Sequence, residues 1–183
     1  MFCAAFFGAR FYARHFALPW LGGEGDGVMT NELLWDGYNA AWPTAGPGEV
    51  GGQFNTIPAW GLPLLNTLIL LTSGVTLTIA HHALKAAQRT QVLVWLGITV
   101  LLGCLFLFFQ VEEYLHAYQE LNLTLGSGIY GSTFFMLTGF HGAHVFLGTL
   151  MLAIMWLRVA KGHFTKDDHF GFEAAAWYWH FVD

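Results

Sequence analysis

The longest charge-free stretches of this sequence constrain its fold more than any other feature. Residues 90–111 and 121–157 contain no Asp, Glu, Lys or Arg, and apolar runs of 18 or more residues are typical of membrane spans. At about 1.5 Å per residue, 90–111 extends over about 33 Å, enough to cross a hydrocarbon core of about 30 Å. Charged residues make up 10% of the chain, against about 25% in soluble domains. These observations exclude a soluble globular domain.

Helices are the expected form of these spans, because a helix satisfies its own backbone hydrogen bonds in lipid. Three complete spans are predicted, at 61–84, 90–111 and 130–157. Residues 1–17 are predicted to be a partial membrane helix because Arg10 and Arg14 interrupt their apolar run, and residues 172–183 begin a further helix. The predicted fold class is therefore all-α, a multi-pass transmembrane helix bundle that forms a single membrane domain over 1–183.

The segments between the spans predict their orientation. Residues 18–60 are rich in Gly and Pro and carry only acidic charges, which is typical of a loop on the outer side. Basic residues favour the cytoplasmic side of a membrane, and Lys85 and Arg89 lie between the first two spans. Arg158 follows the third span, at the start of a predicted inner loop over 158–171. The two basic connections are therefore expected inside and 18–60 outside.

Ionisable side chains near or within the predicted helices are the first candidates for chemistry, because such groups are costly in lipid. His141 and His144 lie three residues apart on one helical face, and His180 lies in the last partial helix. Facing histidines on two helices could bind haem, whereas single histidines commonly form hydrogen bonds to neighbouring helices or subunits. Glu113 and His116 form half of a carboxylate di-iron motif, which needs a second copy. We favour packing roles for His141, His144, Glu113 and His180, and predict no catalytic, cofactor-binding or metal-binding residue.

Small residues in the third span are candidates for close helix packing. Gly139 and Gly142 are the two candidate packing positions, and Gly148 lies further along the same span. Small residues let helix backbones approach closely in lipid. This packing can lie within the bundle or against another protein, and the sequence leaves both open.

A basic cluster follows the third span and is the candidate lipid contact. Arg158, Lys161 and His163 lie where basic side chains can bind lipid phosphates, and the same charges can instead serve only to set topology. The chain has a net charge of −5 with only seven Lys and Arg residues, so the positive surface of a nucleic-acid binder is missing. No nucleic-acid partner is expected.

Three longer motifs resemble one known family. They are PLLNTLILLTSGVTLTIAHHAL at 63–84, YGSTFFMLTGFHGAHVFLG at 130–148 and HFGFEAAAWYWHFVD at 169–183. All three are similar to subunit III of haem-copper terminal oxidases of the cytochrome c oxidase type. The resemblance implies a seven-helix fold, of which this chain would hold three complete and two partial helices. It therefore implies a fragment, truncated at both ends.

The resemblance also implies an accessory role in a proton-pumping oxidase of aerobic respiration. Such a subunit holds no redox metal, stabilises catalytic subunit I, supports its proton uptake and binds phospholipid, while partner subunits carry haem and copper. Arg158, Lys161 and His163 are similar to family positions near lipid head groups. The expected location is a bacterial plasma membrane or a mitochondrial inner membrane.

The sequence is compatible with three other functions. Subunit III of a quinol oxidase would have the same fold, because the electron donor binds other subunits. A relative associated with nitric oxide reductase is a second possibility. A haem-binding membrane cytochrome b comes from a different class, and bound haem would distinguish it.

Overall fold

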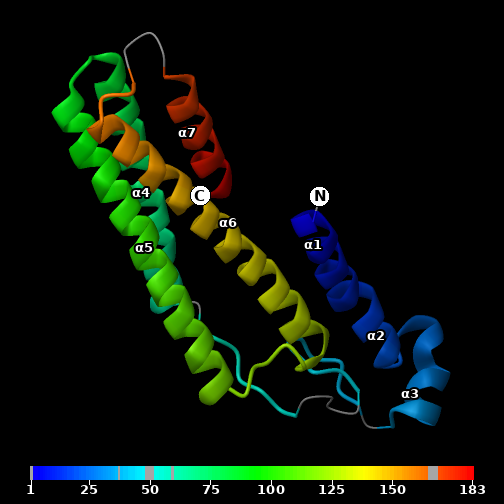
Figure 1. The fold of residues 1–183 in the computed structure, drawn as a ribbon. Coiled ribbons are helices and arrows are strands. Elements are labelled where there is room, and N and C mark those ends of the chain that lie inside the picture. The colour runs from blue at the N-terminus through cyan, green and yellow to red at the C-terminus, as the bar shows by residue number, and fades with distance from the viewer. Residues whose placement is uncertain (1, 37, 48–51, 59, 165–168) are drawn as a thin grey trace. The chain divides into compact units, whose positions relative to one another are not determined.

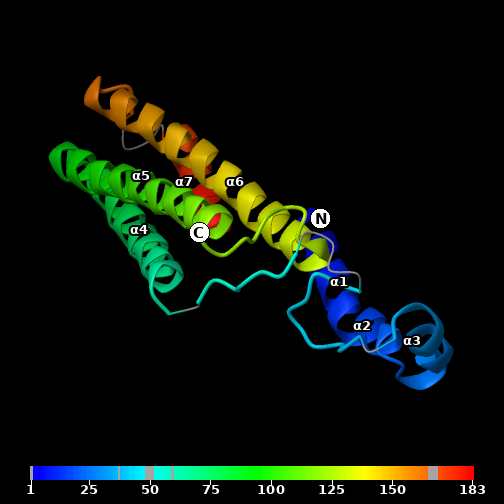
Figure 2. The ribbon, with the colours of Figure 1, turned by 90° about the horizontal axis from the view of Figure 1, so that it is seen from below.

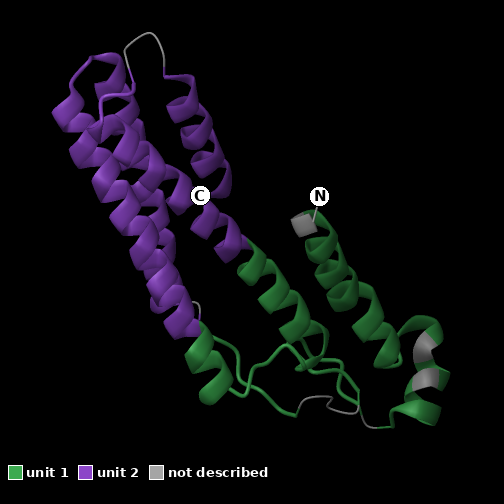
Figure 3. Cartoon of the chain, viewed as in Figure 1, with its two compact units in different colours: residues 1–57, 114–140 green, residues 58–113, 141–183 purple. Residues whose placement is uncertain are grey.

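The computed structural model describes the 183-residue chain except residues 1, 37, 48–51, 59 and 165–168. The described residues form helices and connecting segments without any β-strand, which confirms the all-α prediction. They divide into two compact units, one comprising Met1–Ile57 and Tyr114–Phe140 and the other Pro58–Glu113 and His141–Asp183 (Figure 3). A single domain was expected from the sequence. The single membrane domain stays a prediction, and the two longest helices each contribute residues to both units.

Within the described part of the chain, three helices have the length and composition of membrane spans (Figure 1). They are α4 (Leu62–Lys85), α5 (Arg89–Gln119) and α6 (Gly128–Ala160). The helix α5 continues eight residues beyond the span predicted to end at residue 111. The difference arises because Glu112 and Glu113 end an apolar run without ending a helix, since Glu is a good helix former.

Within the second unit, a short turn and an arginine side chain connect the long helices. A short turn at 86–88 joins α4 to α5, so the two helices run antiparallel (Figure 2). The Arg89 side chain donates Nε–H to the Val159 carbonyl at 3.1 Å, and a second guanidinium N–H to the Ala160 carbonyl. A cation there satisfies the free carbonyls and the negative dipole at the end of α6. Arg89 therefore anchors α5 to the last turn of α6.

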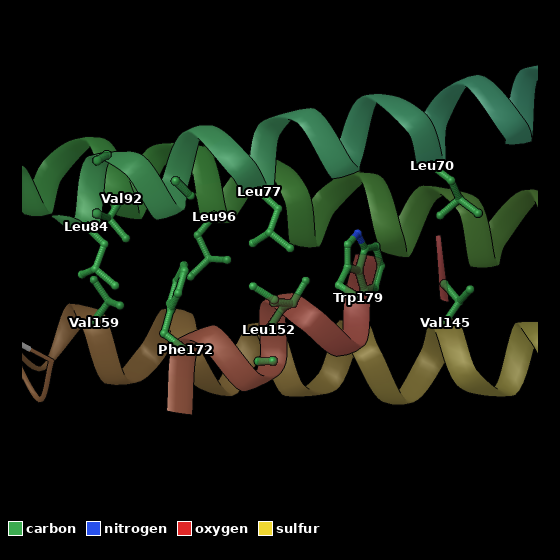
Figure 4. Packing of buried hydrophobic residues seen from close by; sticks show 14 of the residues in the cluster. Leu70, Leu77, Leu84, Val92, Leu96, Val145, Leu152, Val159, Phe172 and Trp179 are labelled. Carbon is green, nitrogen blue, oxygen red and sulfur yellow. The ribbon is translucent and has the colours of Figure 1, made fainter. Parts of the chain in front are cut away.

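The core of the second unit lies between α4, α5, α6 and the short helix α7 (Phe170–Val182) (Figure 4). On α7, Phe172 and Trp179 are each only 1% exposed, whereas Trp177 and Phe181 are 71% and 88% exposed. The helix therefore buries one face in this unit and exposes the other, although all four side chains are aromatic.

The first unit contains α1 (Phe2–Tyr12), a π-helical segment Ala13–Ala17, α2 (Leu18–Leu21) and α3 (Val28–Leu34). Residues 18–60 were predicted to be a loop, so α2 and α3 are departures from that expectation. Pro19 lies within α2, which continues directly from the π-helical segment.

In the rest of the first unit, aromatic side chains pack around Tyr130. Phe54 stacks on Tyr130 with ring centroids 5.2 Å apart, and Trp42 contacts it edge-on at 5.4 Å. The Arg10 guanidinium lies 4.5 Å from the Tyr130 ring centroid and 5.5 Å from that of Trp42. Such cation–π contacts favour a cation beside aromatic faces. They give Arg10 a position against aromatic rings of its own chain.

Candidate functional site

The candidate histidines of α6 both contact aromatic side chains in the second unit. His144 Nδ1 lies 2.6 Å from the Tyr178 hydroxyl of α7, a short hydrogen bond. The His141 ring lies edge-on to Phe106 of α5, with centroids 5.8 Å apart. These contacts join α6 to two different helices. A ring nitrogen of His144 and a ring edge of His141 thus take part in helix packing.

Glu113 and His116, which match half of a di-iron motif but were expected to be packing residues, have different surroundings in the structure. Glu113 is 9% exposed. His116 Nδ1 instead lies 3.0 Å from Glu120 Oε2, one turn further along α5. The structure thus places the exposed Glu120 carboxylate within hydrogen-bond distance of His116 on the same helix.

The His180 side chain lies near polar groups of α7 and α4. Its Nε2 is 3.5 Å from Thr78 Oγ1, and a side chain at Gly74 would clash with the Asp183 carboxylate. The absence of a side chain at Gly74 thus makes room for Asp183. These contacts connect residues about 100 positions apart in the sequence.

Two glycines of α5 and α6 lie against the indole of Trp179. A Cβ at Gly148 of α6 would lie 2.8 Å from Trp179 Cε3, and one at Gly103 of α5 would lie 2.9 Å from Cη2. At the predicted Gly142, a Cβ would be 3.9 Å from its nearest neighbour, Gln110 Cγ, and at Gly139 it would be 3.4 Å from the Tyr114 hydroxyl. A side chain would therefore clash at Gly148 and Gly103 but not at Gly142.

Trp179 itself is a packing residue that the sequence reasoning did not single out. Its indole N–H donates to Ser73 Oγ of α4 at 3.0 Å. A buried Trp needs both apolar neighbours and a partner for its N–H. Trp179 lies beside small and hydroxyl residues in the motif at 169–183. The chain has eight Trp residues, however, so the sequence alone did not identify which of them is buried against other helices.

The basic cluster surrounds the C-terminal end of α6. Arg158, Lys161 and His163 are all exposed, and the Arg158 guanidinium lies 4.6 Å from the Phe164 ring centroid. Backbone hydrogen bonds from Gly162 to Val159 and from His163 to Arg158 form a Schellman motif, in which Gly162 has a φ of 77°. Arg158 therefore lies in the last turn of α6, and Lys161 and His163 directly follow its end.

An apolar groove lies beside the same stretch of α6. Leu93, Gly97 and Leu101 of α5 and Ala153 and Trp156 of α6 are among its lining residues. The Trp156 indole N–H donates to the Leu93 carbonyl at 2.9 Å. The groove surface is therefore almost entirely apolar and suits hydrocarbon.

Together, the three apolar spans and the helix packing through polar and aromatic side chains define a multi-pass helical membrane protein. Residues 36–183 match the family model described as cytochrome c oxidase subunit III. The chain therefore belongs to the cytochrome c oxidase subunit III family, which confirms the resemblance noted in the sequence.

Relatives from distant organisms support this assignment. The chain is 50% identical over 142 residues to cytochrome c oxidase subunit 3 of Oncorhynchus mykiss, covering 78% of the chain and 50% of the relative. It is 49% identical over 144 residues to that of Prototheca wickerhamii, covering 79% and 51%. It is 44% identical over 182 residues to that of Dugong dugon, covering 100% and 59%. The chain thus spans about half to three fifths of the length of these relatives.

Proposed function

We propose that this chain acts as accessory subunit III of a proton-pumping cytochrome c oxidase in aerobic respiration. It assembles with catalytic subunit I and other oxidase subunits, which carry the haem and copper. The observation that carries this proposal is the family match over 36–183, because this range includes all three membrane helices. The complex lies in a bacterial plasma membrane or a mitochondrial inner membrane.

In this role the chain stabilises the catalytic subunit and supports its proton uptake. An exposed apolar stripe on α4 supports an assembly role. Leu68, Leu71 and Val75 are 52%, 58% and 61% exposed and lie on one helical face. In a membrane such a face contacts lipid or another subunit.

The His141 and His144 side chains test the accessory role, because a haem-binding chain would depend on them. The double variant His141→Gln and His144→Gln should lower stability by only about 1 kcal/mol, since membrane hydrogen bonds average about 0.6 kcal/mol each. Haem and copper content of the assembled complex, measured by optical spectroscopy and elemental analysis, should remain normal. The matched control is His82→Gln, at an exposed position. A loss of one metal centre in proportion to the double substitution would refute the accessory role.

Phospholipid binding is the second part of the proposal and involves the inner end of α6. The exposed Arg158, Lys161 and His163 provide positive charge and hydrogen-bond donors for a phosphate. The apolar groove lined by Leu93 and Trp156 provides a surface suited to an acyl chain. Charge and hydrocarbon surface are the two features that an anionic phospholipid requires.

The Arg158→Gln variant should retain less anionic phospholipid than the wild type. Each basic residue near an anionic surface contributes about 1 kcal/mol of attraction, so occupancy should fall about fivefold. Native mass spectrometry of the assembled complex measures the retained lipid, and Arg158→Lys is the charge-conserving control. Unchanged lipid counts together with scrambled topology of the Gln variant would mean that Arg158 only sets orientation.

A further inference from the structure

The short helix α3 exposes a cluster of large apolar side chains in the first unit. Met29, Leu33 and Leu34 are 63%, 72% and 66% exposed. Met29 and Leu33 lie four residues apart and therefore share one helical face, which Leu34 extends. Apolar side chains gathered on a surface in this way indicate contact with a membrane or with another protein.

The opposite face of α3 is held against α2. Asn31 Nδ2 donates to the Gly22 carbonyl at 2.7 Å, and Asn31 is two residues, or about 200° around a helix, from both Met29 and Leu33. Gly23 lies in the connecting turn with a φ of 89°, and a Cβ there would lie 3.0 Å from Asn31 Nδ2. The helix α3 therefore folds back beside α2 (Figure 1, Figure 2) and presents its apolar face away from it.

The residues before α3 indicate the depth of this part of the chain in a membrane. Residues 2–21 form one continuous helical segment, which exposes Phe11 and Phe16. Arg14 on this segment is also exposed, and an exposed Arg in a membrane helix lies where its long side chain can reach the head groups. Trp20, which is 48% exposed, follows about 9 Å further along, and Trp is enriched at the membrane–water interface. This end of the segment is thus suited to the head-group region, and α3 lies directly beside it.

The charges around α3 favour a lipid surface without net charge. All charged side chains between residues 18 and 60 are acidic, so an anionic lipid would be repelled rather than attracted. The face formed by Met29, Leu33 and Leu34 itself carries no charge. Burial of apolar side chains, which is the main attraction of an interfacial helix to neutral lipid, is therefore the force available to α3.

We propose that α3 binds the surface of the bilayer on the predicted outer side, with Met29, Leu33 and Leu34 inserted among zwitterionic phospholipids. This contact attaches the acidic segment after α2 to the membrane surface. The helix lies outside the family match at 36–183. The inference therefore goes beyond the proposed oxidase role, and it depends only on the membrane location of the chain.

Spin labels at single cysteines test the proposal on the full chain. The chain, with the subunits that co-purify with it, is placed in phosphatidylcholine nanodiscs after Cys3 and Cys104 are replaced by Ser. One label is attached at Leu33→Cys on the apolar face, and a control label at Asp26→Cys, an exposed position before α3. Electron paramagnetic resonance measures collisions of each label with O₂, which concentrates in lipid, and with a water-soluble nickel chelate. We expect O₂ collisions to exceed nickel collisions at residue 33, and the reverse at residue 26.

A second pair of variants tests whether the apolar face makes the contact. A label at Met29→Cys should lose its excess of O₂ collisions when Leu33→Asp is added, because a charge is costly to bury in lipid. Glu32→Gln is the matched control on the same helix, at an exposed position, and should leave the excess unchanged.

Each alternative has its own result in these measurements, and none of them depends on oxidase activity. Nickel collisions that exceed O₂ collisions at residue 33 would show that α3 lies in water. A label there that is shielded from both reagents would show that a protein partner covers it. Either result, or an O₂ excess that survives Leu33→Asp, would overturn the proposal.

Discussion

The Trp179→Ala variant should be less stable than the wild type by about 3 kcal/mol, the lower end of the range for removing a buried Trp or Phe side chain. The indole is 1% exposed, donates a hydrogen bond to Ser73, and fills the space that Gly103 and Gly148 leave open. In a membrane the loss comes mainly from dispersion contacts and the hydrogen bond, because lipid offers no hydrophobic driving force between helices. The lower end of the range is therefore expected.

Trp177→Ala is the matched control for this prediction. It removes the same side chain from the same helix, two residues away, at a position that is 71% exposed in this chain. Unfolding of both variants by denaturant in detergent, followed by circular dichroism, measures the difference. Equal losses in the two variants would contradict the packing described for α7.

The Gly148→Ala variant should lose about 2 kcal/mol, within the usual cost of overpacking a core. The added Cβ would lie 2.8 Å from Trp179 Cε3, and the surrounding helices prevent the indole from moving freely. Alanine is the better helix former by up to about 1 kcal/mol, so the steric cost must exceed this gain.

Gly142→Ala is the control, because its Cβ would have its nearest neighbour at 3.9 Å. It should be neutral or stabilising by up to about 1 kcal/mol. The same unfolding measurement compares the two variants. A Gly148→Ala variant as stable as Gly142→Ala would show that α6 and α7 do not pack as described.

The membrane helices could be predicted from sequence because lipid thickness and the cost of charge limit where a span can lie. The helix predicted over 61–84 is observed as Leu62–Lys85, and the one expected from 130 begins at Gly128. The end of α5 could not be predicted in the same way. Beyond the hydrocarbon region a helix is limited by local propensity rather than by polarity, so α5 continues to Gln119.

The contacts of the candidate residues were less predictable, because they depend on which helices are neighbours. The pattern in α6 marked His144 as a packing residue, but its partner Tyr178 lies 34 residues away. Nothing in the local sequence distinguishes Gly148 from Gly142, since the difference is the Trp179 ring beside one of them.

The polar contacts of Glu173 with His81 and His169 could not be predicted for the same reason. The i,i+4 spacing of His169 and Glu173 was a visible signal, but it covers only one of the two contacts. His81 lies on α4, 92 residues from Glu173. Only the packing of α4 against α7 brings His81 Nε2 to 3.1 Å from Glu173 Oε1.

Purification of the natural protein from its own membrane in mild detergent tests the proposed function most directly. Co-purifying proteins are identified by mass spectrometry, and haem and copper are measured in the complex and after the subunits are separated. Our account predicts a complex with a haem-copper catalytic subunit, in which haem and copper remain with that partner after separation. A Soret band that stays with this chain, or purification without any haem-copper partner, would contradict it.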